Sequence, residues 1–138
     1  MKILVAVDGS KPSLKAVQLL IDHADWYRSR PEVELVAVHL PLPTVRHLNK
    51  AQVDKYYAEE GEAMLAAARK KLDAARLRYE ARVLVGPVAE TLVQHAQAKG
   101  CDLIYIGTRG RTALGKALLG STATKVLHIS EIPVLLVK

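Results

Sequence analysis

Residues 102–121 read DLIYIGTRGRTALGKALLGS, a short apolar run that passes into a loop rich in glycine. The run 102–107 has the length and apolar content that are typical of a strand buried on both faces of a sheet. Open α/β sheets bind their ligands beyond the carboxyl ends of such strands. We therefore expect the functional site to involve the segment that follows, 108–119, which shows neither helix nor strand periodicity.

The rest of the chain alternates between short apolar runs and amphipathic stretches. Strands are predicted at 2–7, 33–40, 79–85, 102–107 and 132–137. Helices are predicted after Ser10, across 50–78, after Pro87 and across 120–130. Gly61 weakens the middle of the second helix, which predicts either a break there or a mobile first half. This alternation indicates an α/β fold, in which a parallel sheet is covered by helices on both faces.

The loop after the fourth strand contains residue types that bind phosphate groups: Gly107, Arg109, Gly110, Gly120, Ser121 and Thr122. Glycine lacks a Cβ, so the backbone at Gly107 and Gly110 can approach a ligand within hydrogen-bonding distance. Gly120 and Ser121 open the last predicted helix, whose unpaired N–H groups and dipole attract anions. The pattern predicts a phosphate site. A glycine-rich turn that serves only chain geometry is the alternative.

Residues 110–117, GRTALGKA, nearly match the phosphate-binding loop of P-loop nucleotide hydrolases. The last position of that motif is a Ser or Thr that holds magnesium, and Ala117 stands there instead. A P-loop also normally follows an early strand, whereas this octet follows the fourth. The octet is therefore not interpreted as a P-loop, and the phosphate prediction depends on the wider glycine spacing.

Three segments together resemble the universal stress protein family. They are MKILVAVDGS at 1–10, the spacing Gly107-x2-Gly110-x9-Gly120-Ser121, and IPVLLVK at 132–138. The resemblance covers essentially the whole chain, and it implies a single domain, 1–138. It also implies a Rossmann-like sheet of five parallel strands in the order 3-2-1-4-5, and a homodimer. Because the glycine pattern is complete, the chain resembles the ATP-binding members.

The resemblance assigns three further residues to the nucleotide site. Asp8 matches the acid at the end of strand one that faces the ribose, the phosphates or their magnesium ion. Val7 and Leu40 match backbone positions that flank adenine. In this strand order the connection reverses between strands one and four, so the crevice is expected between Asp8 and Gly107. The alternative for Asp8 is a turn acid whose side chain holds the local backbone.

No catalytic arrangement can be singled out from residue spacing. His39, near the expected crevice, is interpreted as a buried, hydrogen-bonded histidine rather than a catalytic one. Hydrolysis of ATP is expected to be slow at most, because Asp8 is the only candidate base. The alternatives are a weak ATPase or nucleotidyl transferase, and a nucleotide-free interaction protein. Such a transferase usually has an HxGH-type pair after strand one, where this chain has Asp8-Gly9-Ser10-Lys11.

Composition narrows the partners and the compartment. The 138 residues carry a net charge of +6, but the basic residues are scattered and no aromatics lie among them, so nucleic-acid binding is not favoured. No apolar run approaches the roughly 20 residues of a membrane span. The single cysteine, Cys101, excludes an internal disulfide and fits a cytoplasmic protein.

The last predicted strand lies at the sheet edge and is entirely apolar: Val134, Leu135, Leu136 and Val137. An exposed edge of this kind invites pairing with another chain. The family resemblance implies that the partner is a second copy, paired antiparallel across a two-fold axis. An edge covered by a helix or loop of the same chain is the alternative.

Overall fold

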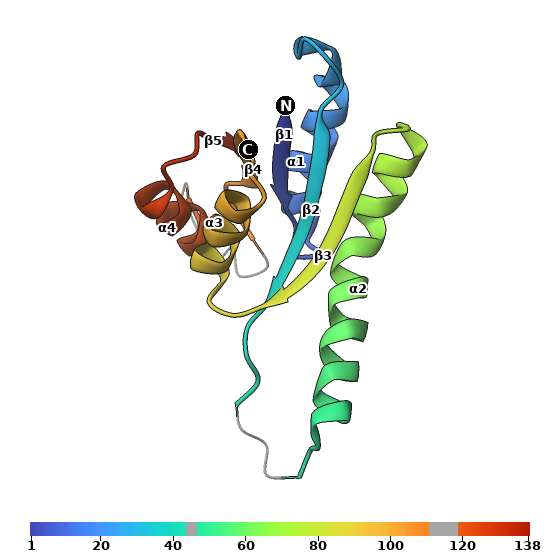
Figure 1. The fold of residues 1–138 in the computed structure, drawn as a ribbon, viewed down its shortest axis with the longest axis vertical. Coiled ribbons are helices and arrows are strands. Elements are labelled where there is room, and N and C mark those ends of the chain that lie inside the picture. Colours follow the sequence, from blue (N-terminus) through green and yellow to red (C-terminus); the bar gives the residue numbers. More distant parts are fainter. Residues whose placement is uncertain (44–46, 111–118) are drawn as a thin grey trace.

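The computed structural model describes residues 1–43, 47–110 and 119–138. At its centre lies a parallel sheet of five strands in the order β3-β2-β1-β4-β5 (Figure 1). The strands are β1 (Lys2–Ala6), β2 (Glu32–His39), β3 (Tyr79–Val85), β4 (Leu103–Gly107) and β5 (Val134–Val137). The α/β fold and the strand order expected from the sequence are confirmed.

Helices cover both faces of the sheet. They are α1 (Lys11–Asp22), α2 (Lys50–Ala74), α3 (Val88–Ala98) and α4 (Ser121–Ile129), with a short 3-10 helix, η1 (Ala24–Trp26), that the sequence did not predict. Apolar residues of α1 and α2 pack in one core cluster, and those of α3 and α4 pack in a second. Successive residues of a strand face opposite sides of the sheet, so β1 sends Ile3 and Val5 into the first cluster and Leu4 and Ala6 into the second.

Gly61 does not break α2, and the sequence-based prediction of a break there is wrong. The helix is continuous from Lys50 to Ala74, and Gly61 is buried against β3. A Cβ built on Gly61 would lie 2.2 Å from a methyl carbon of Val83. Glycine is therefore needed for close helix–sheet packing, which outweighs the roughly 1 kcal/mol by which glycine disfavours a helix interior relative to alanine.

The first turns of α2 extend past the end of the sheet (Figure 1). Most residues from 50 to 59 are exposed, in contrast to Met64, Leu65, Ala68 and Leu72 further along, which are buried. Asn49 starts the helix with a reciprocal pair of hydrogen bonds to Gln52. Among the described residues, no helix is both long and apolar enough to cross a membrane.

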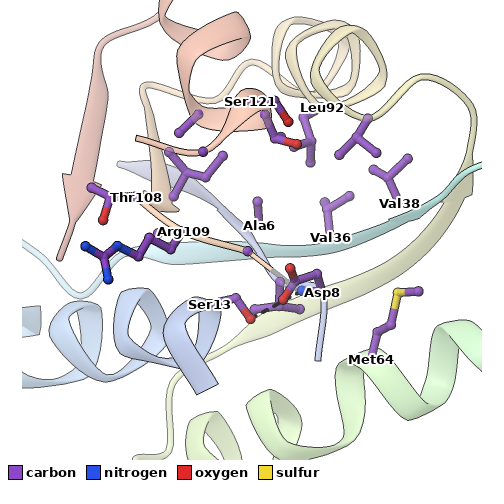
Figure 2. Close-up of a pocket in the computed structure, with 18 of the residues that line it drawn as sticks. Ala6, Asp8, Ser13, Val36, Val38, Met64, Leu92, Thr108, Arg109 and Ser121 are labelled. Carbon is purple, nitrogen blue, oxygen red and sulfur yellow. Dashed lines mark hydrogen bonds between the residues drawn. The ribbon is translucent and has the colours of Figure 1, made fainter. Parts of the chain in front are cut away.

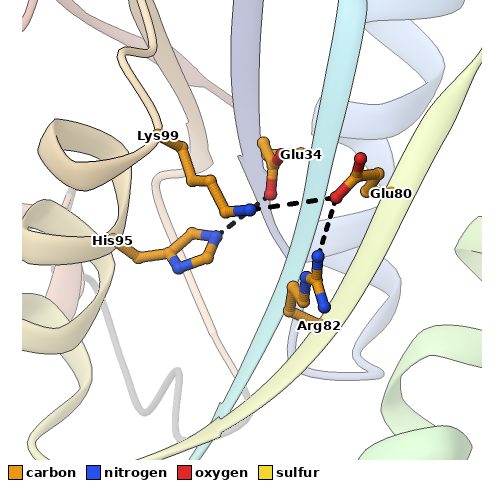
Figure 3. A network of polar contacts seen from close by, with 5 residues as sticks. All are labelled: Glu34, Glu80, Arg82, His95 and Lys99. Atoms are coloured by element: carbon orange, nitrogen blue, oxygen red, sulfur yellow. Dashed lines mark hydrogen bonds and ion pairs between the residues drawn. The ribbon is translucent and has the colours of Figure 1, made fainter.

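A buried contact between a carboxylate and an imidazole joins β2 to α3 (Figure 3). A carboxylate oxygen of Glu34 lies 3.0 Å from Nε2 of His95, and the two side chains are only 3% and 13% exposed. Lys99 and Arg82 approach Glu80 nearby, at 3.9 and 2.8 Å, in a more exposed setting. A buried charge needs such a partner because transfer out of water is costly.

Cys101, the single cysteine, is buried in the second core cluster. Burial raises the pKa of its thiol to about 11, and the negative charge of Glu34 adds to the rise. Because the thiolate is the reactive form, this thiol is held unreactive at neutral pH.

Candidate functional site

A cavity of about 470 Å³ opens beyond the carboxyl ends of β1 and β4 (Figure 2). Between these two strands the direction of the connections reverses, which is where open α/β sheets bind their ligands. All nine residues predicted for the site line this cavity: Val7, Asp8, Leu40, Gly107, Arg109, Gly110, Gly120, Ser121 and Thr122. The fold therefore brings together the end of strand one, the end of strand two and the glycine loop.

Asp8 holds the local backbone and also lines the cavity. Its Oδ1 accepts hydrogen bonds from the backbone N–H of Ser10, at 2.9 Å, and from the Ser10 hydroxyl. Ser10 in turn caps α1 by accepting from the N–H of Ser13. The interpretation of Asp8 as a turn acid is thus correct, and the same turn presents its carboxyl group to the cavity.

Two glycines of the described part of the loop, Gly107 and Gly110, lie close to neighbouring atoms. Among the described residues, the glycines with positive φ are Gly9, Gly86 and Gly100. A Cβ on Gly110 would lie 2.9 Å from Oδ2 of Asp8, and one on Gly107 would lie 3.1 Å from the carbonyl oxygen of Pro12. Any larger residue at 110 would therefore press on the Asp8 carboxylate from inside the cavity.

The N-terminus of α4 faces the same cavity. Gly120 precedes the helix, and its N–H donates to the carbonyl of Thr108 at 2.6 Å, which fixes the glycine loop against α4. Within the described residues, no side chain caps the first turn of this helix. Uncapped N–H groups and the helix dipole make such an end attractive to anions. Ser121 and Thr122, both lining the cavity, add hydroxyl groups at this end.

The second strand supplies backbone polar groups to the cavity wall. β1 ends first: the N–H of Val7 donates to the carbonyl of Val36 at 2.9 Å, and β2 continues to His39. On the other edge, the carbonyl of His39 accepts from Gly86 at 3.0 Å. Peptide groups alternate between the two edges of a strand, so those of Val38 face the side that β1 has vacated. That side is the cavity, which Val38 and Leu40 line.

The fold, the cavity and the glycine loop can be compared with known proteins. A profile of the Universal stress protein family matches residues 1–138. The chain belongs to the universal stress protein family. It is 31% identical to Universal stress protein MJ0531 of Methanocaldococcus jannaschii over 146 residues, covering 99% of this chain and 81% of that protein.

Solved members of the family have the same fold. The structure of MJ0577, also from Methanocaldococcus jannaschii, superimposes with a TM-score of 0.81 at 28% identity, over 99% of this chain and 94% of that one. A universal stress protein solved in complex with cAMP superimposes with a TM-score of 0.75 at 26% identity, over 100% and 97%. The family expected from the sequence is therefore confirmed.

Several residues that line the cavity of this universal stress protein were missed by sequence reasoning. Its apolar walls come from three strands and two helices: Ala6, Val36, Val38, Val88, Leu92, Ile106 and Ala123 (Figure 2). Thr108 could have been found, because it lies between two predicted residues. Ser13 could also have been found, because it is one turn beyond the Ser10 cap. Met64 reaches the cavity from α2, which no local pattern indicates.

His39 is half-buried at the cavity wall, and its Nδ1 lies 2.7 Å from the carbonyl oxygen of Leu40. The contact agrees with the interpretation of this residue as hydrogen-bonded, but the histidine is half-buried and not buried as expected. Arg111, Lys116 and most of the octet 110–117 lie outside the described residues. In the described part of the chain, no group of three or more His, Cys, Asp or Glu side chains could hold a metal ion.

Proposed function

We propose that this universal stress protein binds ATP with magnesium in the cavity and acts as a regulatory or signalling module. The observation that carries the proposal is the meeting of three features around one cavity. These features are the uncapped N-terminus of α4, the close approach of Gly110 to Asp8, and the apolar walls between β2 and α3. A nucleotide needs both an anion site and an apolar site.

In this proposal, the phosphates bind at the glycine loop. The backbone at Gly107 and Gly110 and the first turn of α4 would donate hydrogen bonds to them, with the hydroxyls of Ser121 and Thr122. Arg109 also lines the cavity and would supply positive charge. Hydrogen bonds to charged groups are shorter and roughly twice as strong as neutral ones.

The base is placed at the opposite wall, between Val7 and Leu40. There the peptide groups on the open edge of β2 offer a donor and an acceptor side by side. Adenine presents an acceptor next to its amino donor, so it matches such an edge, whereas guanine presents a carbonyl where adenine has the amino group. A relative at 26% identity was solved with cAMP, an adenine nucleotide, which supports this class of ligand.

Magnesium fits as an ion carried by the nucleotide. Asp8 is the only carboxylate among the described residues that line the cavity. Magnesium is commonly held by one or two carboxylates together with substrate phosphates, not by a protein cage. Asp8 would therefore contact the ion or the waters around it, and the ion would supply charge neutralisation for the phosphates.

Hydrolysis is proposed to be slow at most. Asp8 is already engaged in holding the turn before α1, and no other acid of the described cavity wall can serve as a general base. Binding itself would then be the signal. A cytoplasmic location is part of the proposal, since a free, buried Cys101 suits a reducing compartment.

Protein purified without heat or denaturant is expected to carry adenine nucleotide. Release by acid and mass spectrometry should find ATP in the wild-type preparation and much less in a Gly110→Val preparation made in parallel. Recovery of AMP or a cyclic nucleotide in place of ATP would support the assigned site but show that its ligand is not ATP. Equal amounts of ATP in both preparations would contradict the assigned loop.

We propose that the homodimer forms through β5. This strand pairs with β4 on one edge, and no described strand pairs with its other edge. The carbonyls of Pro133 and Val137 accept from the N–H groups of Ile104 and Thr108, so the alternate peptide groups of Val134 and Leu136 face outward. The four residues Val134, Leu135, Leu136 and Val137 would pair with their copies antiparallel.

Leu136→Pro is expected to convert the dimer to a monomer, because proline removes one outward N–H without touching the β4 ladder. Analytical ultracentrifugation would report the mass, with circular dichroism to check the fold. A folded Leu136→Pro variant that sediments as the wild-type dimer would show that the chains do not pair through this edge.

A further inference from the structure

The segment directly after β2 is hydrogen-bonded to α2, near the first turns that extend past the end of the sheet. The backbone N–H of Leu42 donates to the hydroxyl of Tyr57 at 2.7 Å. Tyr57 is half-buried, although most residues around it on α2 are exposed. This bond joins the segment that leaves the cavity wall to the first turns of α2.

The ring of His39 strengthens the same connection. Its edge-on contacts with Tyr56 and Tyr57 have ring centroids 5.5 and 5.2 Å apart. A carbonyl oxygen can only accept, so the 2.7 Å contact between Nδ1 and the Leu40 carbonyl places a proton on Nδ1. The His39 ring thereby orients the peptide group of Leu40, while the two tyrosine rings orient His39.

The other side of this segment is held by β3. The carbonyl of His39 accepts from the N–H of Gly86 at 3.0 Å. Residues 39–42 are therefore fixed between Gly86 on one side and Tyr57 on the other. His39 and Leu40 line the cavity, on the β2 side where the base is proposed to bind.

We propose that Tyr57 is a positioning residue for recognition of the base. Through Leu42 and His39 it fixes the direction of the Leu40 peptide group, which sets the donor and acceptor pattern that adenine meets. The inference rests on the proposed nucleotide function and adds to it a residue outside the cavity wall that sets base selectivity. The phosphate end has no contact with Tyr57 in the described structure, so phosphate binding does not depend on it.

The test compares ATP with GTP, which carries the same triphosphate on the other purine. Both are titrated as magnesium complexes into wild-type and Tyr57→Phe protein by calorimetry. Phenylalanine keeps the ring and its contact with His39 and removes only the hydroxyl. We expect the affinity for ATP to fall about fivefold, the effect of one ordinary hydrogen bond, with little change for GTP. The preference for ATP over GTP should therefore fall by about the same factor.

Tyr79→Phe is the matched control. It makes the same chemical change and removes the contacts of the Tyr79 hydroxyl with Asp73, at 2.9 Å, and with Arg69, near the opposite end of β3. Its ATP and GTP affinities should equal those of the wild type. Thermal unfolding of all three proteins shows whether the losses are in binding or in stability.

The outcomes separate this inference from the function beneath it. Wild-type protein that binds neither nucleotide would overturn the nucleotide function and the role of Tyr57 with it. Wild-type protein that binds both equally would show that the site does not distinguish adenine from guanine, which would also overturn the role of Tyr57. If ATP is preferred and Tyr57→Phe leaves the ratio unchanged, nucleotide binding stands and the positioning role of Tyr57 is wrong.

Discussion

Replacement of His95 by alanine is expected to lower the free energy of unfolding by about 3 kcal/mol, because it leaves the buried carboxyl group of Glu34 without its imidazole partner. Glu34 is 2% exposed and sits in the core between β2 and α3, where water cannot replace the imidazole. Its carboxyl group is hydrogen-bonded to the imidazole of His95 at 3.0 Å. Urea unfolding followed by circular dichroism measures the loss.

Lys99→Ala is the control for this prediction. Its partner Glu80 is largely exposed and 3.9 Å away, so the loss should stay below about 1 kcal/mol, as for surface ion pairs. Replacing Glu34 and His95 together by leucine should recover much of the stability, since two apolar residues need no mutual compensation. A His95→Ala variant as stable as Lys99→Ala would contradict the stabilising role of the Glu34–His95 contact.

Gly110→Val is expected to weaken ATP binding about a hundredfold, the equivalent of losing two or more hydrogen bonds. A Cβ at 110 already falls 2.9 Å from Oδ2 of Asp8, and valine adds two further methyl groups to it. The side chain would displace the Asp8 carboxylate and occupy the space assigned to the phosphates. Calorimetric titration with magnesium and ATP measures the affinity.

Two further variants separate this effect from general damage. Gly110→Ala adds one carbon and should cause a smaller loss than valine. Ala74→Val adds the same two methyl groups at an exposed position at the far end of α2 and should bind ATP as the wild type does. A folded Gly110→Val protein with wild-type affinity would show that the phosphates do not lie at this loop.

Much of the fold could be predicted because it depends on local patterns. The strand predicted at 79–85 was found with the same bounds, and the helix predicted at 120–130 differs by one residue at each end. The second helix was predicted to reach residue 78 but ends at Ala74. It stops in a Schellman-type turn, with Arg76 at φ 54° and the N–H of Leu77 donating to Leu72. Glycine usually marks such a turn, and here arginine takes its place.

The residues of the site also differ in how far the sequence could predict them. Residues next to the glycine spacing, such as Ser121, could be predicted because the motif is contiguous with a strand end and a helix start. The apolar wall could not, since Leu92 and Val36 are ordinary core residues until the fold places them at the cavity. Glu34 gives no local signal either, because the partner that permits its burial lies 61 residues away.

Calorimetric titration of magnesium and ATP into wild-type protein freed of any co-purified nucleotide tests most directly whether the cavity binds ATP. We predict saturable binding of one ATP per chain, weakened about a hundredfold in Gly110→Val. Well-folded wild-type protein that gives no binding heat at any of several temperatures and retains no ATP in equilibrium dialysis would contradict this prediction.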